Sequence, residues 1–178
     1  SPVTPLPIPG LSILDEFLSP SSASHLLTRV DASRWRPLSH RRVQNYGGLP
    51  SEKGMVPVPL PDWLAPVAAQ VAAALPEPEK ITPNHVLVND YEPGDGIEHH
   101  TDGPVYQPVA AILSLLSPLV MTFRPRDPHS TQDPSSPSLL IERNVLLRPG
   151  SLLIMSGPAY SEWMHGILRV RTDEGLRG

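Results

Sequence analysis

From residue 85 onward, the chain carries short apolar runs that are broken by Pro, Gly or Ser. The first run covers residues 85–91 and ends at the sequence Pro-Gly-Asp-Gly of residues 93–96, so it predicts a strand followed by a turn. Five further runs predict strands, at residues 109–116, 119–123, 139–147, 151–155 and 160–167. Several short strands between such turns indicate a sandwich, a barrel or a jelly roll.

Helical patterns are confined to the first half of the chain. Ser19 followed by Pro20 is typical of an N-cap and a first helical position, and predicts a helix that continues to about Val30. An alanine-rich stretch predicts a second helix over about residues 62–75. Residues 1–10 are rich in proline, and we expect them to form an extended arm.

The two patterns together predict an α+β protein that is mainly β, with helices flanking a β core. We expect residues 1–178 to form a single domain, in which residues 1–84 supply the arm and the helices, and residues 85–178 form the β core. The segment 124–138 holds four Pro and four Ser, which is typical of a mobile surface loop between two strands.

Composition narrows the classes of function. Hydrophobic residues make up 39% of the chain and charged residues 18%, which excludes a highly charged disordered protein even though 24 of the 178 residues are proline. A net charge of -4 argues against a dedicated high-affinity nucleic-acid binder. The sequence shows neither an apolar run long enough to span a membrane nor a secretion signal, so we expect a soluble monomer inside the cell, in the cytoplasm, the nucleus or both.

The absence of cysteine excludes disulfides and thiolate metal sites, so any metal ion must be held by His, Asp or Glu. His100 and Asp102 are two residues apart, and in a strand they would point to the same face. His165 lies on a later predicted strand that an antiparallel fold can bring beside them. Two histidines and one carboxylate form the facial triad of non-haem Fe(II) oxygenases. A catalytic zinc site remains an alternative, as does a core role for His165, whereas His99 would point to the opposite face.

Several motifs occur in an order that resembles the AlkB family of iron- and 2-oxoglutarate-dependent dioxygenases. They are Asn-Asp-Tyr-Glu-Pro-Gly-Asp-Gly-Ile at residues 89–97, His-Thr-Asp-Gly at residues 100–103 and His-Gly at residues 165–166. Further stretches at residues 41–50, 84–89 and 157–160 resemble the eukaryotic subgroup called AlkB homologue six. The likeness spans about residues 35–167 and implies a double-stranded β-helix, or jelly-roll, core. By this resemblance, residues 85–178 would form the catalytic core and residues 1–84 would include a possible substrate-recognition region.

The resemblance implies roles for particular residues. His100, Asp102 and His165 would be the Fe(II) ligands, and Asn89 and Tyr91 would donate hydrogen bonds to 2-oxoglutarate, with O₂ as the second co-substrate. Asn89 and Tyr91 are also two residues apart on a predicted strand, so an amide and a phenol would face the same side. The alternative is an ordinary asparagine at a strand end beside a packed tyrosine.

The family also holds 2-oxoglutarate with two arginines that are separated by five residues and follow the second histidine. Arg171 and Arg177 have that spacing. However, Arg171 follows His165 closely, and residues 172–176 lack the apolar alternation of a buried strand. The alternative is that the strand with the anchoring arginines lies outside the sequence given.

The distribution of charge bears on the substrate class but leaves it open, since a basic stretch can also be an ordinary solvated face with core aromatics. Between residues 29 and 53, six basic residues face two acidic ones, and this local excess fits a nucleic-acid partner, RNA or DNA, with Arg41, Arg42 and Tyr46 as candidate substrate-binding residues. The resemblance implies oxidative demethylation or hydroxylation. Five acids without a base between residues 90 and 102 would repel a phosphate backbone. A hydroxylase of proteins and a weakly active or inactive binding module therefore remain alternatives.

Overall fold

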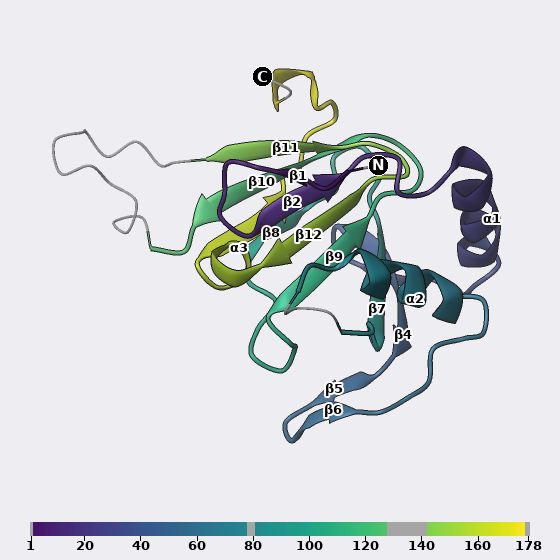
Figure 1. Ribbon diagram of the computed structural model, residues 1–178. Helices are drawn as coiled ribbons and strands as arrows, with labels where there is room; N and C mark the ends of the chain where they lie inside the picture. Colours follow the sequence, from purple (N-terminus) through teal and green to yellow (C-terminus); the bar gives the residue numbers. More distant parts are fainter. Residues whose placement is uncertain (1, 78–80, 128–141, 177–178) are drawn as a thin grey trace, which may run out of the picture.

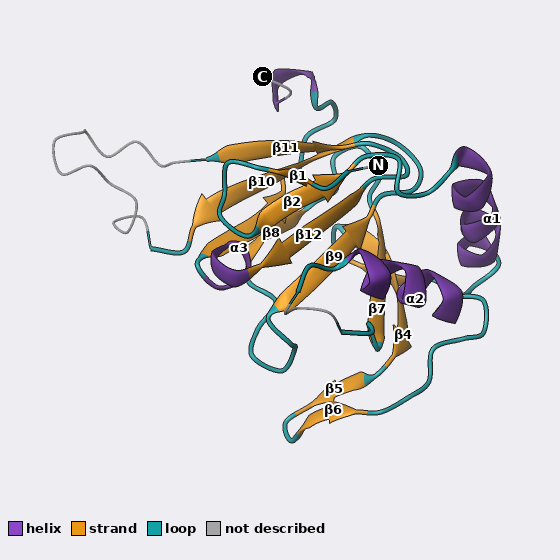
Figure 2. Ribbon diagram, in the orientation of Figure 1, coloured by secondary structure: helices purple, strands orange, loops and turns teal. Residues whose placement is uncertain are grey.

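Two four-stranded antiparallel sheets face each other at the centre of the computed structural model, which describes residues 2–77, 81–127 and 142–176 (Figures 1 and 2). The first sheet has the order β1 (Thr4–Pro5), β2 (Leu11–Leu14), β12 (Leu152–Ser156) and β9 (Val109–Leu113). The second has the order β11 (Arg143–Leu147), β10 (Leu119–Pro125), β13 (Trp163–Ile167) and β8 (Ile97–His100). Two such sheets of an eight-stranded fold are the jelly-roll arrangement, as the sequence predicts.

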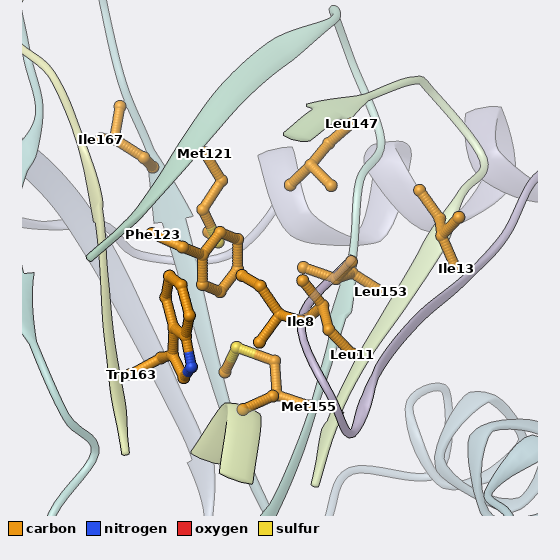
Figure 3. Close-up of a cluster of buried hydrophobic side chains, with 11 residues drawn as sticks. Ile8, Leu11, Ile13, Met121, Phe123, Leu147, Leu153, Met155, Trp163 and Ile167 are labelled. Carbon is orange, nitrogen blue, oxygen red and sulfur yellow. The ribbon is translucent and has the colours of Figure 1, made fainter. Parts of the chain in front are cut away.

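The main hydrophobic core lies between these two sheets (Figure 3). Alternate residues of each strand point inward, so Met121 and Phe123 from β10 meet Leu153 and Met155 from β12. Phe123 and Leu153 are completely buried. Each buried side chain of this size contributes about 1.5–3 kcal/mol to the free energy of unfolding. This core fixes β10, and with it the neighbouring strands β13 and β8.

A third antiparallel sheet carries the residues before the core strands. It has the order β3 (Arg36–Leu38), β4 (Arg41–Gly47) and β7 (His85–Asp90), and a small hairpin of β5 (Leu49–Ser51) and β6 (Gly54–Val56) follows β4 in the chain. The residues of β4 and β7 are paired from Arg42 opposite Asp90 to Gly47 opposite His85. Since paired residues point to the same side of a sheet, this register decides which side chains share a face.

Helices α1 (Pro20–Asp31) and α2 (Ala65–Ala74) lie on the same side of the sheets (Figure 2). The predicted N-cap of α1 is confirmed, because the Ser19 hydroxyl accepts a hydrogen bond from the Ser22 N–H at 3.2 Å. Apolar residues of α2, including Val71, pack against Leu152 and Ile154 of the first sheet. Within the described residues, no helix is long and apolar enough to cross a membrane.

Two expectations for the first half of the chain are wrong. Residues 2–10 do not form the extended arm expected for residues 1–10, because β1 pairs with β2, β2 in turn pairs with β12, and Ile8 is 1% exposed within the core. Residues 36–56 form strands, where the sequence analysis predicts no element. These strands obtain their partners from distant parts of the chain, and hydrophobic periodicity within the segment does not reveal such pairing.

Two boundaries in the second half also differ from the prediction. The strand β10 continues through Pro125, and the N–H of Arg126 donates to the Glu162 carbonyl at 2.7 Å, so the loop expected at residues 124–138 begins later. Residues 128–138 of that expected loop lie outside the described residues. The strand predicted at residues 160–167 starts at Trp163, because Pro158 initiates a short helix, α3 (Gly157–Ser161).

Candidate metal centre and co-substrate site

Three potential metal ligands meet where β8 and β13 lie side by side. His165 of β13 is paired directly with His100 of β8, and Asp102 follows two residues after β8. The Asp102 Oδ1 atom lies 3.9 Å from His100 Nε2 and 3.7 Å from His165 Nε2. One ligand atom from each of the three residues lies within 4.8 Å of the other two. The structure therefore brings the predicted facial triad together, with ligand atoms close enough to bind one ion.

The two imidazole rings are oriented for metal binding. His100 Nδ1 donates to the backbone carbonyl of Glu98 at 2.8 Å, which leaves the lone pair of Nε2 on the side of Asp102. Burial is the main reason that the pKa of His165 is lowered to about 4; Asp102 raises it, whereas His100 and His99 lower it. His165 is thus neutral near pH 7 and can donate its lone pair to a cation.

Glycines allow β8 and β13 to approach closely. A Cβ on Gly166 would lie 2.9 Å from the Ile97 carbonyl oxygen and 3.1 Å from the His99 nitrogen. A Cβ on Gly96 would overlap the Ile167 carbonyl oxygen. These positions flank the pair of histidines in sequence, so the absence of side chains there lets His100 and His165 come together.

His99 behaves differently from its neighbour His100. Its Nε2 lies 2.7 Å from the hydroxyl oxygen of the fully buried Thr122 on β10. His99 is absent from the ligand group formed by the described residues. Alternation along the strand explains this difference, as the sequence predicts.

Asn89 lies near the end of β7, and Tyr91 is the first residue after this strand. Tyr91 packs against the main core, and the face of the third sheet that carries Asn89 is called its inner face. Burial raises the pKa of Tyr91 to about 12, and the charge of Arg41 lowers it by less. The phenol therefore keeps its proton near pH 7 and can donate a hydrogen bond. Among the described residues, the buried Oδ1 of Asn89 has no hydrogen-bond partner.

The two C-terminal arginines have no comparable surroundings. Arg171 lies after β13 and is exposed. Arg177 lies outside the described residues. Their part in binding 2-oxoglutarate stays a prediction.

The three candidate substrate residues do not share one face. Arg41 lines a groove of about 320 Å³ on the inner face of the third sheet. Arg42 lies on the opposite face, where its Nε donates to Asp90 Oδ2 at 2.7 Å and its guanidinium stacks 4.5 Å from the ring centre of Trp35. Tyr46 lies on that opposite face too, where its hydroxyl donates to Gln44 Oε1 at 2.8 Å. Only Arg41 of the three lines the groove.

Three further side chains contribute to the groove or contact the segment after the metal motif, and the sequence motifs assign no role to them. His85 and Tyr106 line the groove, and their rings stack with centres 5.4 Å apart. The Tyr160 hydroxyl donates to the Gly103 carbonyl at 3.4 Å, and burial together with the charge of Asp102 raises the pKa of Tyr160. Tyr106 follows the His-Thr-Asp motif by four residues, and this short distance in the sequence is the signal that could have indicated its position near the site.

Comparisons with known proteins agree with this geometry. Residues 34–177 match the family described as the 2OG-Fe(II) oxygenase superfamily. The chain is 37% identical over 172 residues to the zebrafish (Danio rerio) protein named "Probable RNA/DNA demethylase ALKBH6", and the match covers 93% of this chain and 72% of that protein. The chain belongs to the AlkB family of this superfamily.

Two further relatives support the AlkB assignment. The Arabidopsis thaliana protein named "Alkylated DNA repair protein ALKBH8 homolog" is 30% identical over 188 residues, which cover 95% of this chain and 54% of that protein. The structure titled "The structure of OsALKBH1" shares the fold with a TM-score of 0.62 and 14% identity, over 93% of this chain and 88% of that one. The predicted jelly-roll fold and the predicted resemblance are thus both confirmed.

AlkB-family enzymes are Fe(II)- and 2-oxoglutarate-dependent dioxygenases, and the residues of this chain fit that chemistry. His100, Asp102 and His165 supply two imidazoles and one carboxylate, the donor set of non-haem Fe(II) oxygenases. Asn89, whose buried Oδ1 has no partner among the described residues, and the protonated Tyr91 would hold 2-oxoglutarate, with the Asn89 Nδ2 and the Tyr91 hydroxyl as the donors. With Fe(II), 2-oxoglutarate and O₂ bound, O₂ would be the oxidant: one of its oxygen atoms would be used to convert 2-oxoglutarate to succinate and CO₂, and the other to hydroxylate a substrate C–H bond.

Proposed function

We propose that this dioxygenase oxidatively demethylates a modified base in RNA or DNA. The observation that carries the proposal is the groove on the inner face of the third sheet: Arg36, Arg41 and His85 lie on the same strand face as Asn89, and Tyr106 joins them from the segment between β8 and β9. Hydroxylation of an N-methyl group gives a hemiaminal that releases formaldehyde, and the base is left demethylated. The printed names of the zebrafish and Arabidopsis relatives, a probable RNA/DNA demethylase and an alkylated DNA repair protein, support the same class of substrate.

The aromatic part of the groove suits a nucleobase. The rings of His85 and Tyr106 are stacked, with an angle of 27° between their planes. Burial lowers the pKa of His85, so its imidazole is neutral near pH 7 and its ring presents an uncharged π surface. Bases that are unpaired or flipped out of a duplex stack on aromatic side chains of this kind, which contributes about 1–3 kcal/mol per base.

Electrostatics also favour a polyanion more than the sequence alone indicates. Of the five acids between residues 90 and 102, Asp90 is paired with Arg42 at 2.7 Å and Glu98 with Arg169 at 2.9 Å. Asp102 belongs to the metal centre. The groove itself is lined by two arginines, Arg36 and Arg41. The acidic edge is therefore partly neutralised, and the repulsion of a phosphate backbone expected from the sequence is reduced.

The experiment that tests the proposal measures succinate and formaldehyde release. The wild type would be supplied with Fe(II), 2-oxoglutarate and O₂, with single-stranded RNA or DNA oligonucleotides that carry N-methylated bases, and with unmethylated oligonucleotides as the control. We expect formaldehyde only from the methylated oligonucleotides. Asp102→Ala and His165→Ala should abolish turnover while leaving the fold intact, because each removes one of three metal ligands.

Variants of the groove separate a nucleic-acid substrate from other substrates. Tyr106→Ala should raise the KM for a methylated oligonucleotide about 10-fold, whereas Tyr106→Phe should bind it nearly as well, because the stacking ring is retained. Succinate formation that no oligonucleotide stimulates, but that a protein extract does, would show that the enzyme hydroxylates a protein. Complete inertness of the metal-loaded wild type would indicate a binding module.

We further propose that the enzyme acts as a monomer within the cell, in the nucleus or the cytoplasm, where RNA and DNA are found. All three ligands of the candidate metal centre come from one chain, which supports a monomer.

A further inference from the structure

The pairing between β8 and β13 is irregular beside the metal centre. Its register shifts between two neighbouring pairs, which are His165 with His100 and Ile167 with Ile97. Between these pairs, Gly166 alone on β13 lies opposite both Glu98 and His99 on β8. Two residues opposite one form a β-bulge, which bends the strand and interrupts its ladder of hydrogen bonds. The backbone therefore holds β8 less firmly at the residue before a metal ligand.

The bulge decides the direction of His100. In a regular strand, residues three apart point to opposite faces of the sheet. Ile97 packs against the main core, and its partner Ile167 is buried there. Without the extra residue, His100 would point away from that side. The bulge lets Ile97 and His100 both point inward, to the side where His165 lies beside Phe123. The metal centre thus depends on the shape of the bulge.

Thr122 of β10 ties this bulge to the two neighbouring strands. It is paired with Gly166, and its hydroxyl donates to the Gly166 carbonyl at 3.3 Å. The same hydroxyl oxygen lies 2.7 Å from His99 Nε2. A hydroxyl carries one proton, so the imidazole donates in this shorter bond. Thr122 is 0% exposed, and water does not compete for either bond.

The bond between His99 and Thr122 crosses a whole strand, because β13 lies between β8 and β10. A side chain at residue 166 would stand on the face that carries Thr122, since the two residues are paired. Its Cβ would lie 3.1 Å from the His99 nitrogen. Glycine at this position therefore leaves the path open for the imidazole.

We propose that Thr122 and His99 are positioning residues of the metal centre. Their hydrogen bond holds the bulge of β8 in the shape that directs His100 toward the metal ion. Both side chains lie outside the ligand group of the described residues, so they act through the backbone of β8. Partners outside the ligand set that orient metal ligands change the metal affinity about 10- to 100-fold. This inference rests on the proposed ligands and not on which substrate is oxidised.

The experiment separates the hydroxyl group from the shape of the side chain. Thr122→Val keeps the branched shape without the hydroxyl, and Thr122→Ser keeps the hydroxyl. His99→Phe removes the donor, whereas His99→Gln retains an N–H donor. Thr28→Val is the matched control, because the Thr28 hydroxyl also donates to a backbone carbonyl, that of Ser24, but on the exposed side of α1. Dissociation constants for Mn²⁺ would be measured by calorimetry without O₂ at a single pH, and melting temperatures by circular dichroism.

We expect Thr122→Val and His99→Phe each to weaken Mn²⁺ binding at least about 10-fold. Thr122→Ser should bind Mn²⁺ nearly as tightly as the wild type, and His99→Gln should recover part of the affinity. Because both substitutions break the same bond, the double variant should lose little more affinity than either single variant. A merely structural role of Thr122 would lower the melting temperature and leave the Mn²⁺ affinity of the folded protein unchanged.

Two results would overturn the positioning role. One is a Mn²⁺ affinity of Thr122→Val and His99→Phe that equals that of Thr28→Val, whatever their melting temperatures. The other is an equal loss of affinity in Thr122→Ser and Thr122→Val, which would assign the effect to shape. His99 is half-buried, so His99→Phe decides the matter should Thr122→Val fail to melt cooperatively.

The same measurements distinguish this inference from the assignments on which it rests. Failure of the wild type to bind Mn²⁺ would overturn the metal centre and, with it, the positioning role. The expected Mn²⁺ affinities, together with a wild type that acts on no oligonucleotide, would support the positioning role and contradict only the proposed function.

Discussion

Replacing Gly166 with alanine tests whether the close approach of β8 and β13 builds the metal centre. The added Cβ would lie 2.9 Å from the Ile97 oxygen, and 3.1 Å and 3.2 Å from the nitrogen and Cα of His99. All three contacts are to backbone atoms, so no side chain can rotate away and β8 itself must move. Overpacking of this kind costs about 1–3 kcal/mol. Because His100 belongs to β8, its ring would also shift relative to His165.

Gly175→Ala is the matched control, since a Cβ there meets no atom within 4 Å. Both substitutions reduce the conformational entropy of the unfolded chain equally, so the difference between the variants isolates the strain. For a protein of this size, the Gly166→Ala variant should melt about 2–12 °C below the control in thermal unfolding followed by circular dichroism. Mn²⁺ affinity should fall at least about 10-fold. Equal melting temperatures and equal Mn²⁺ affinities for the two variants would refute this account of the glycine.

Three further predictions concern the scaffold. Phe123→Ala should lower the free energy of unfolding by about 3–5 kcal/mol in urea titrations, because the ring is 0% exposed between the two sheets; a loss below 1 kcal/mol would contradict that packing. Ser19→Ala should cost about 0.5–2 kcal/mol through loss of the helix cap, and Ser19→Asp should retain most of the stability. Burial lowers the pKa of His85 below its ordinary 6.5, so the stabilisation from its neutral imidazole is fully present above pH 6.5 and is lost as the pH falls. Between about pH 7 and pH 5, the melting temperature of the wild type should therefore drop more than that of the His85→Gln variant. Equal decreases for the two proteins would disprove this role of His85.

The grouping of the three candidate metal ligands could be predicted from the sequence because their signals are local. His100 and Asp102 are close in the chain, and His165 lies in a recognisable strand of its own. The order of the strands within the sheets could not be predicted from the sequence. The pairing of β13 with β8 and β10 depends on the shared core around Phe123, to which distant segments contribute. Local periodicity predicts that a strand exists, but not its partner.

The N-terminal strands could not be predicted for a related reason. Proline-rich residues 1–10 have the composition of an arm, yet Ile8 and Leu11 fill the core. The segment 36–56 contains three arginines, which strands can carry on a solvent-facing side. These charges interrupt the apolar pattern by which a strand is recognised in a sequence. The composition of these segments therefore reflects their exposed side chains, and it does not reveal the tertiary contacts that order them.

The third sheet shows why charge counted along the sequence is a poor guide to the site. Neighbouring residues on a strand point to opposite faces, so Arg41 turns toward the groove while Arg42 pairs with Asp90 on the other side. The same alternation separates Asn89, on the inner face, from Asp90. A basic excess over residues 29–53 thus divides between two surfaces, and an acidic run is partly cancelled by it. The charge that acts on a ligand is that of one face, and only the register between β4 and β7 defines this face.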